Sequence, residues 1–150
     1  MLYSRATQHA IRALTHLVTI PAGTYVAVRD VANATRVPLP YLAKIMQSLA
    51  RGGLVASRKG PGGGVALRRG AARITLAQIV DAVDGNGVFT GCLLGLQRCS
   101  DASPCAVHEV WKTLRETLRQ ELHELTLAEI APAQRPDSRR TRGRAPRSNS

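Results

Sequence analysis

Three cysteines and one histidine are the residues of this 150-residue chain whose types and spacing suggest chemistry. Cys92, Cys99 and Cys105 are its only cysteines, and His108 follows the last of them by three residues. In a reducing compartment, clustered cysteines more often bind metal or do redox chemistry than form disulfides. Three thiolates and an imidazole are a sound ligand set for zinc or for an iron–sulfur cluster. We therefore predict a metal site at these four residues.

The spacing of the ligands leaves the kind of site open. Structural zinc sites usually hold cysteines separated by roughly two to four residues, whereas the gaps here are six and five residues. Longer gaps allow a loop to wrap a larger cluster. Three alternatives stay open at this level: an iron–sulfur cluster, a zinc ion, or thiols that bind no metal. For His108, the alternative is an ordinary position on a helix surface.

A long helix is expected to follow the cysteines. Ser103 and Pro104 suit its N-cap and first position. Cys105 would then lie in the first turn, where free N–H groups and the helix dipole stabilise a thiolate. Up to about Glu129, apolar residues recur on one stripe: Val107, Trp111, Leu114, Leu118, Leu122 and Leu125. A helix of about 25 residues, roughly 37 Å long, is too long for this domain to cover alone. We therefore expect a homodimer, with partial cover by the first helix.

A DNA-binding head is predicted before the cysteines. Apolar residues repeat at helical spacing in three segments: residues 3–20, 28–35 and 39–51. A three-residue turn joins the second segment to the third. Strands over residues 54–57 and 65–67 are expected to pair as a hairpin. Two short helices, a tight turn and a basic hairpin are typical of a winged helix-turn-helix. The fold is thus predicted to be mainly α with a small β-hairpin, plus a long C-terminal dimerisation helix.

The third helix carries the first set of predicted DNA contacts. Its outward-facing residues are Pro40, Tyr41, Lys44, Gln47, Ser48 and Arg51. Gln47 and Ser48 can bond base edges in the major groove. Tyr41, Lys44 and Arg51 suit phosphates.

The hairpin tip carries the second set of predicted contacts. Arg58 and Lys59 supply positive charge, and Gly60, Gly62 and Gly63 let the backbone approach the sugar-phosphate wall closely. No G-K-[S/T] sequence follows the glycines and no helix begins there, so the run is not a P-loop. The alternative is a solvated basic hairpin without function.

The charge of the chain favours a polyanionic partner. The formal net charge is +11. Residues 133–150 hold six arginines and one aspartate, which leaves fifteen basic and nine acidic residues in 1–132. A basic folded part favours nucleic acid, although arginine-rich codon usage is an alternative cause. The tail is rich in Arg, Pro and Ser and is predicted to be disordered.

Several function classes are disfavoured. No segment reaches the ~18 uninterrupted apolar residues of a membrane span, and the N-terminus does not resemble a signal peptide. We expect a cytoplasmic protein with no membrane partner and no small-molecule substrate. It has no C-x-x-C motif and no evident general base beside a nucleophile, so no enzyme is expected. A zinc-stabilised adaptor that binds proteins through its long helix remains the alternative from another class.

Several motifs together resemble a known family. They are Val28-Arg29-Asp30-Val31-Ala32, Arg58-Lys59-Gly60-Pro61-Gly62-Gly63-Gly64, Ile79-Val80-Asp81-Ala82-Val83-Asp84-Gly85, and the three cysteines with His108 and Trp111. Over about residues 1–131 the chain resembles the Rrf family of winged-helix transcriptional regulators, of the IscR- and NsrR-like kind. The resemblance implies a DNA-binding transcriptional regulator, which we expect to be a repressor. It also implies a homodimer with crossed long helices on a two-fold symmetric operator in double-stranded DNA.

The resemblance further implies an iron–sulfur cluster on Cys92, Cys99 and Cys105. A [2Fe–2S] cluster is favoured, with [4Fe–4S] as the alternative, and it would sense iron–sulfur or iron status, nitric oxide or redox state. In some members a histidine placed like His108 is the fourth ligand; in others it is an acidic residue near the partner's N-terminus. Gln8 stands in that region here and is a poor ligand, so His108 is favoured.

The predicted organisation has four parts. They are a winged helix-turn-helix domain (residues 1–84), a cysteine-containing cluster-binding loop (85–104), a dimerisation helix with the C-terminal close (105–131), and a disordered basic tail (132–150). A fourth helix is expected near the end of the first domain. It should begin at Thr75, because Gln78 stands three residues later, as a capping box requires.

Overall fold

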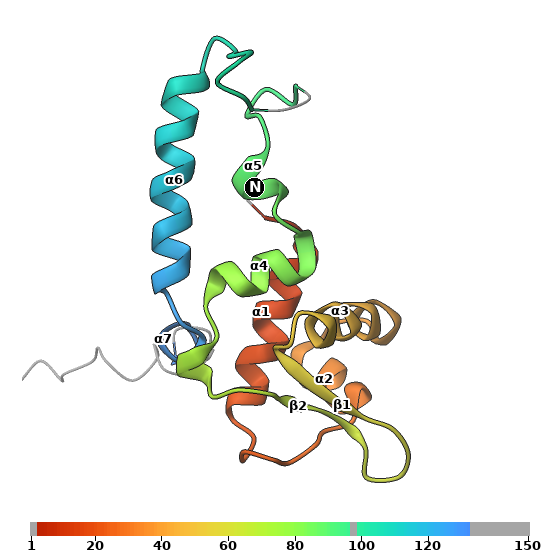
Figure 1. Cartoon of the computed structure of the whole chain (residues 1–150). Coiled ribbons are helices and arrows are strands. Elements are labelled where there is room, and N and C mark those ends of the chain that lie inside the picture. Colours follow the sequence, from red (N-terminus) through yellow and green to blue (C-terminus); the bar gives the residue numbers. More distant parts are fainter. Residues whose placement is uncertain (1–2, 97–98, 133–150) are drawn as a thin grey trace, which may run out of the picture.

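The structure is a computed structural model that describes residues 3–96 and 99–132 (Figure 1). Its elements in chain order are α1 (Arg5–Val18), α2 (Val28–Thr35), α3 (Leu39–Arg51), β1 (Val55–Arg58), β2 (Gly64–Leu67), the 3-10 turn η1 (Ala71–Arg73), α4 (Leu76–Asp84), α5 (Gly87–Thr90), α6 (His108–Glu124) and α7 (Leu127–Ile130). We call residues 3–84 the head and residues 85–124 the cysteine arm. Apart from Pro132, the predicted tail lies outside the described residues.

The head is built on α1, whose buried face meets α2, α3 and α4. The fully buried side chains of this core include Leu14, Val31, Leu42, Leu49 and Ile79. The predicted helix-turn-helix is confirmed, since α2 and α3 have the expected bounds.

The turn between α2 and α3 is tight because the chain reverses at one residue. Arg36 takes the left-handed conformation at φ 57° and caps α2 by donating its N–H to the Ala32 carbonyl. Pro40 lies in the first turn of α3, where its missing N–H costs nothing. The turn therefore fixes the angle at which α3 leaves α2.

The predicted hairpin is also confirmed. β1 and β2 pair antiparallel, with Val55 opposite Leu67 and Arg58 opposite Gly64. Val26 adds a bridge, donating to the Val65 carbonyl at 2.9 Å and accepting from the Val65 N–H at 2.8 Å. A Cβ at Gly64 would overlap the Val26 carbonyl, so this bridge requires glycine there.

The cysteine arm departs from the prediction at its start. A short helix, α5, forms within the segment expected to be a loop. The fourth helix begins as predicted, with Thr75 and Gln78 in a capping box. Its last residue, Asp84, reaches the start of α1, where its carboxylate accepts from the Ser4 N–H at 2.8 Å, from the Ser4 hydroxyl and from the Thr7 hydroxyl at 2.9 Å.

The prediction of one continuous helix from Cys105 to Glu129 is wrong. Helix α6 begins at His108, so Cys105 lies in the turn before it rather than at its second position. It ends at Glu124, and Leu125 is extended. Thr126 then starts α7 with a capping box that includes Glu129. The break follows because Leu125 and Leu127 bond the backbone of residues 74–76: Leu76 donates to the Leu125 carbonyl at 2.8 Å and Leu127 to the Ile74 carbonyl at 2.7 Å.

The predicted apolar stripe of α6 is only partly covered by its own chain. Leu122 is buried and Leu118 packs against the core of the head. Leu114, predicted on the same stripe, is 56% exposed, and Val110 beside it is 66% exposed. Helix α6 thus has an inner face that contacts its own chain and a second, uncovered apolar strip.

No helix in residues 3–96 or 99–132 combines the length and hydropathy that a bilayer crossing requires.

Asp84→Ala should lower the free energy of unfolding by about 1–3 kcal/mol, because it leaves the polar groups of Ser4 and Thr7 without their acceptor. Thr7 is fully buried, so water cannot replace the carboxylate there. The matched control is Asp81→Ala, one turn earlier on the exposed face of α4. Urea unfolding followed by circular dichroism measures both. Equal midpoints for the two variants would mean that Asp84 does not hold α4 to α1.

Candidate metal centre and nucleic-acid interface

The structure brings all four predicted ligands together. Cys92, Cys99, Cys105 and His108 line one pocket of about 340 Å³, together with Leu96, Ser100 and Ser103. The sulfurs of Cys92 and Cys105 are 3.9 Å apart, and the Cys99 sulfur lies 3.3 Å from Nδ1 of His108. All three thiols are partly exposed and free.

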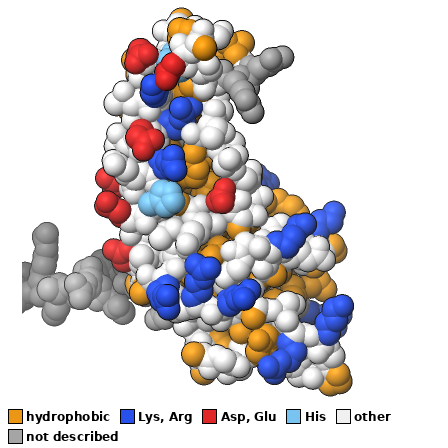
Figure 2. Space-filling view, viewed as in Figure 1, with side chains coloured by type: hydrophobic (Ala, Val, Ile, Leu, Met, Phe, Trp, Pro, Cys, Tyr) orange, Lys and Arg blue, Asp and Glu red, His pale blue; other side chains and the backbone are white. Residues whose placement is uncertain are grey.

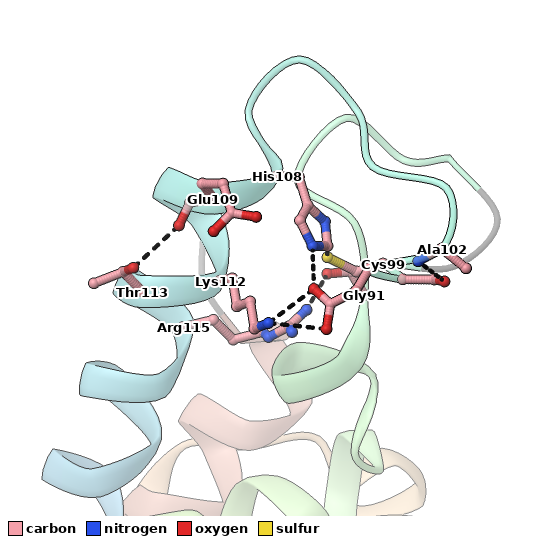
Figure 3. Close-up of polar contacts among 10 residues, drawn as sticks. Gly91, Cys99, Ala102, His108, Glu109, Lys112, Thr113 and Arg115 are labelled. Atoms are coloured by element: carbon pink, nitrogen blue, oxygen red, sulfur yellow. Dashed lines mark hydrogen bonds and ion pairs between the residues drawn. The ribbon is translucent and has the colours of Figure 1, made fainter.

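His108 is buried at the start of α6, with its side chain 4% exposed. Its Nδ1 faces Cys99, and its Nε2 lies 2.8 Å from a carboxylate oxygen of Asp101. Figure 3 shows the His108 ring pointing from α6 toward Cys99, with Lys112 one turn further along the helix. The reading of this histidine as a surface residue is therefore wrong.

Asp101 connects His108 to Lys112. Both of its oxygens accept from the Lys112 ammonium, at 2.8 and 2.9 Å. These bonds, and the smaller effect of His108, lower the pKa of Asp101 to about 2, while the same contact raises the pKa of Lys112. Neither Asp101 nor Lys112 was predicted from the sequence. The sequence signal for them is their spacing from His108: Asp101 stands seven residues before the histidine and Lys112 four residues after it.

Cys92 sits in a backbone turn that favours its thiolate. The N–H groups of Leu94 and Leu96 lower the pKa of the Cys92 thiol. A thiolate, rather than a thiol, is the nucleophile and the metal ligand. The turn therefore prepares Cys92 for either role.

Trp111 anchors the segment just before Cys92. Its indole N–H donates to the Gly91 carbonyl at 2.8 Å, and Arg115 donates to the same oxygen at 3.3 Å. Two residues on the inner face of α6 thus hold the first cysteine against the helix that carries His108. Trp111 is the only tryptophan of the chain, which makes it a reporter for this site.

The donor set fits a thiolate-ligated metal or cluster. The three cysteines and His108 line one shared pocket, with Cys92 near Cys105 and Cys99 near His108. Sulfur and imidazole ligands suit zinc and iron–sulfur centres, whereas hard cations prefer oxygen.

The predicted DNA contacts lie on α3 and on the hairpin of the head. Five of the six residues on α3 are exposed: Pro40, Tyr41, Lys44, Gln47 and Arg51. Ser48 is half-buried, and its hydroxyl bonds the Lys44 carbonyl at 3.4 Å. A groove of about 480 Å³ runs between α3 and the hairpin, lined by Gln47, Arg51 and Ser57 among others.

The hairpin tip presents exposed charge and open backbone. Arg58 stacks on the Tyr25 ring with its guanidinium 4.3 Å from the ring centre, so part of its role is structural. Lys59 is exposed. Gly60 and Gly62 have positive φ and open space where a Cβ would stand, whereas a Cβ at Gly63 would overlap the Arg58 carbonyl. Gly63 is thus required by the turn itself.

Charge is unevenly distributed along the molecule. Residues 3–84 hold eleven basic and three acidic residues, whereas α6 holds three basic and four acidic ones. Figure 2 shows lysine and arginine side chains spread over the head and acidic side chains along α6. The electrostatic attraction for a polyanion therefore lies on the head.

Comparisons with known proteins agree with this arrangement. The family model of Rrf2, described as an iron-dependent transcriptional regulator, matches residues 3–133. The transcriptional regulator IscR of Yersinia pseudotuberculosis is 31% identical over 143 residues, covering 89% of this chain and 87% of the relative.

Solved structures share the fold at lower identity. T. potens IscR aligns with a TM-score of 0.67 and 20% identity, covering 88% of this chain and 87% of that one. The oxidised form of Staphylococcus aureus CymR aligns with a TM-score of 0.67 and 21% identity, covering 87% and 96%. The relatives are transcriptional regulators and not enzymes. The chain belongs to the Rrf2 family and is a DNA-binding transcriptional regulator.

Proposed function

We propose that this regulator senses its signal through an iron–sulfur cluster held by Cys92, Cys99, Cys105 and His108. The observation that carries the proposal is the convergence of these four donors on one pocket of the cysteine arm. The IscR-named relatives support a cluster. A [2Fe–2S] cluster is the favoured occupant and [4Fe–4S] the alternative. The cluster would supply a centre that iron supply, nitric oxide or oxidants can change.

Residues around the pocket would favour binding of a cluster and would link its presence to the position of the Cys92 segment. The Leu94 and Leu96 N–H groups favour the thiolate of Cys92. Trp111 and Arg115 hold the backbone at Gly91. Three exposed leucines, Leu93, Leu94 and Leu96, lie beside the pocket. In this proposal, loss of the cluster releases the Cys92 segment from α6.

Anaerobically purified protein should be brown, with matched iron and acid-labile sulfide and thiolate-to-iron bands between about 320 and 460 nm. Emission of Trp111 should be quenched when the cluster is present, because the indole bonds the residue next to Cys92. Cys105→Ser should lose the cluster, while Ser103→Ala, in the same pocket, should retain it. Colourless protein that resists reconstitution, or protein that carries only zinc, would refute the cluster and leave DNA binding intact.

A thiol switch is the second candidate, favoured by one distance. The Cys92 and Cys105 sulfurs are 3.9 Å apart, so a shift of about 2 Å would bring them to disulfide length. A peroxide would take two electrons and two protons from the two thiols, forming the disulfide and water. One solved relative is an oxidised form. In the experiment above, a metal-free protein that forms this disulfide reversibly and changes its DNA affinity would favour the switch.

We further propose that α3 enters the major groove and that the hairpin tip follows the adjacent backbone. Gln47 and Ser48 would meet base edges, with Pro40 beside them. Tyr41, Lys44, Arg51, Arg58 and Lys59 would meet phosphates, and Gly60, Gly62 and Gly63 would allow close approach. Exposure of these residues and the positive charge of the head support this surface. The regulator would act in the cytoplasm, and repression is the favoured outcome of binding.

Lys59→Ala should weaken DNA binding on all sequences and lower the slope of log affinity against log salt by about one. Arg73→Ala removes the same charge from η1, which contacts α7 rather than α3 or the hairpin tip. This control variant should leave the slope unchanged. Gln47→Ala should instead reduce the preference for operator over random DNA. Fluorescence anisotropy at several salt concentrations separates these effects. An unchanged slope for Lys59→Ala would remove the tip from the interface.

A homodimer is proposed as the form that binds a two-fold symmetric operator. The exposed strip of α6, Val110 and Leu114, gives a second copy an apolar face to cover. Family resemblance supports crossing of the two helices. Dimerisation would place two heads on one face of the DNA duplex.

Leu114→Glu should convert the dimer to a monomer, because it places a charge at the centre of the apolar strip. Thr113→Glu adds the same charge to an exposed neighbouring position of α6 and should leave the dimer intact. Sedimentation velocity distinguishes the two forms. Wild-type protein that sediments as a monomer at all concentrations would contradict the proposal.

A further inference from the structure

The strongest unassigned feature is the contact of His108 with Asp101 on the side of the ring that faces away from the cysteines. His108 is 3% exposed, and each ring nitrogen has one polar neighbour. Nδ1 lies 3.3 Å from the Cys99 sulfur and Nε2 2.8 Å from Asp101 Oδ1. The two neighbours therefore compete to decide which nitrogen carries the hydrogen.

Asp101 is held as an acceptor by Lys112. The lysine ammonium donates to both carboxylate oxygens. An ionised carboxylate only accepts hydrogen bonds, so Nε2 of His108 must be the donor in their contact. In a neutral imidazole the other nitrogen is then unprotonated, which leaves the Nδ1 lone pair directed toward Cys99.

Asp101 is not itself suited to bind a hard cation here. The oxygens of Asp101 and Glu109 lie near His108, within 4.8 Å of one another. The Lys112 ammonium, however, already occupies the Asp101 carboxylate at ion-pair distance. An ammonium group at that place disfavours a second cation, which leaves the histidine as the group on which Asp101 acts.

We propose that Asp101, anchored by Lys112, is the positioning residue of the metal centre: it fixes the hydrogen of His108 on Nε2 and presents Nδ1 to the cysteine pocket. The role of Nδ1 as a ligand rests on the proposed function, whereas the tautomer of His108 is independent of it. A carboxylate behind a ligating histidine orients the ring and raises its basicity, and losing such a partner typically costs about 10–100-fold in metal affinity.

The first test uses metal-free, reduced, full-length protein with nitrogen-15-labelled histidine. At about pH 8, where a histidine is ordinarily neutral, long-range proton–nitrogen spectra should show the His108 hydrogen on Nε2 and slow to exchange with water. Asp101→Ala should make that hydrogen exchange rapidly, whereas Glu109→Ala, which removes the neighbouring exposed carboxylate, should not. A hydrogen found on Nδ1 in the wild type, or protection unchanged in Asp101→Ala, would overturn the proposal.

The second test measures affinity for Co²⁺ added to the same reduced protein, followed by its thiolate charge-transfer absorption. Asp101→Ala should weaken binding about tenfold or more, and Glu109→Ala by much less. In a His108→Ala background, Asp101→Ala should have no further effect, because it acts through the histidine. An equal loss with and without His108 would show a general charge effect and overturn the positioning role. Absence of any Co²⁺ binding would count against the metal centre, while the tautomer measurement still decides the role of Asp101.

Discussion

Two backbone hydrogen bonds between distant parts of the chain determine where the cysteine arm ends. Leu76 bonds the Leu125 carbonyl and Leu127 bonds the Ile74 carbonyl. Ile74 and Leu127 are fully buried beside this bridge. Burying each of these side chains contributes about 1.5–3 kcal/mol, more than the roughly 1 kcal/mol of a typical hydrogen bond. The apolar contacts therefore hold the bridge, and the hydrogen bonds set its register.

The bridge also explains the helices on either side of it. Thr75 and Thr126 pair with each other and each begins a helix through a capping box. The backbone and side chain of Thr126 lower the pKa of Glu129, so the second box is charged near neutral pH. Helix α7 packs on α1 and on η1 just after the hairpin. The far end of the cysteine arm is thus attached to the base of the hairpin.

The predictable part of the fold is the part governed by local signals. Helical spacing of apolar residues, Pro40 near a helix start and the Thr75–Gln78 pair each act within a few residues. The bounds of α2 and α3 and the hairpin therefore followed from the sequence. The long C-terminal helix did not, because the extended conformation at Leu125 is imposed by residues 74–76, about fifty positions earlier. Periodicity continues across such a break, and a capping box at Thr126 with Glu129 was the only local sign of it.

The candidate site shows the same division. The four candidate ligands could be named from residue type, their spacing in the chain and the family resemblance. Asp101 and Lys112 could not, and neither could the bond from Trp111 to Gly91, because only the fold shows which charged and aromatic residues face His108 or Gly91. Pairing of Cys92 with Cys105 and of Cys99 with His108 likewise depends on how the loop closes.

The separation of the two sites constrains any regulatory mechanism. Figure 1 places the cysteine loop and the hairpin at opposite ends of the molecule, so an occupant of the pocket would have no direct contact with the residues proposed to face DNA. Three contacts join the arm to the head: α6 packs on α4, Asp84 just before the arm bonds the start of α1, and the bridge with α7 lies at the hairpin base. Helices α4 and α7 both contact α1, the helix around which the head is packed. A change in the pocket could therefore reach α3 through α1 and α4, and in the proposed dimer it would act on the relative placement of the two heads.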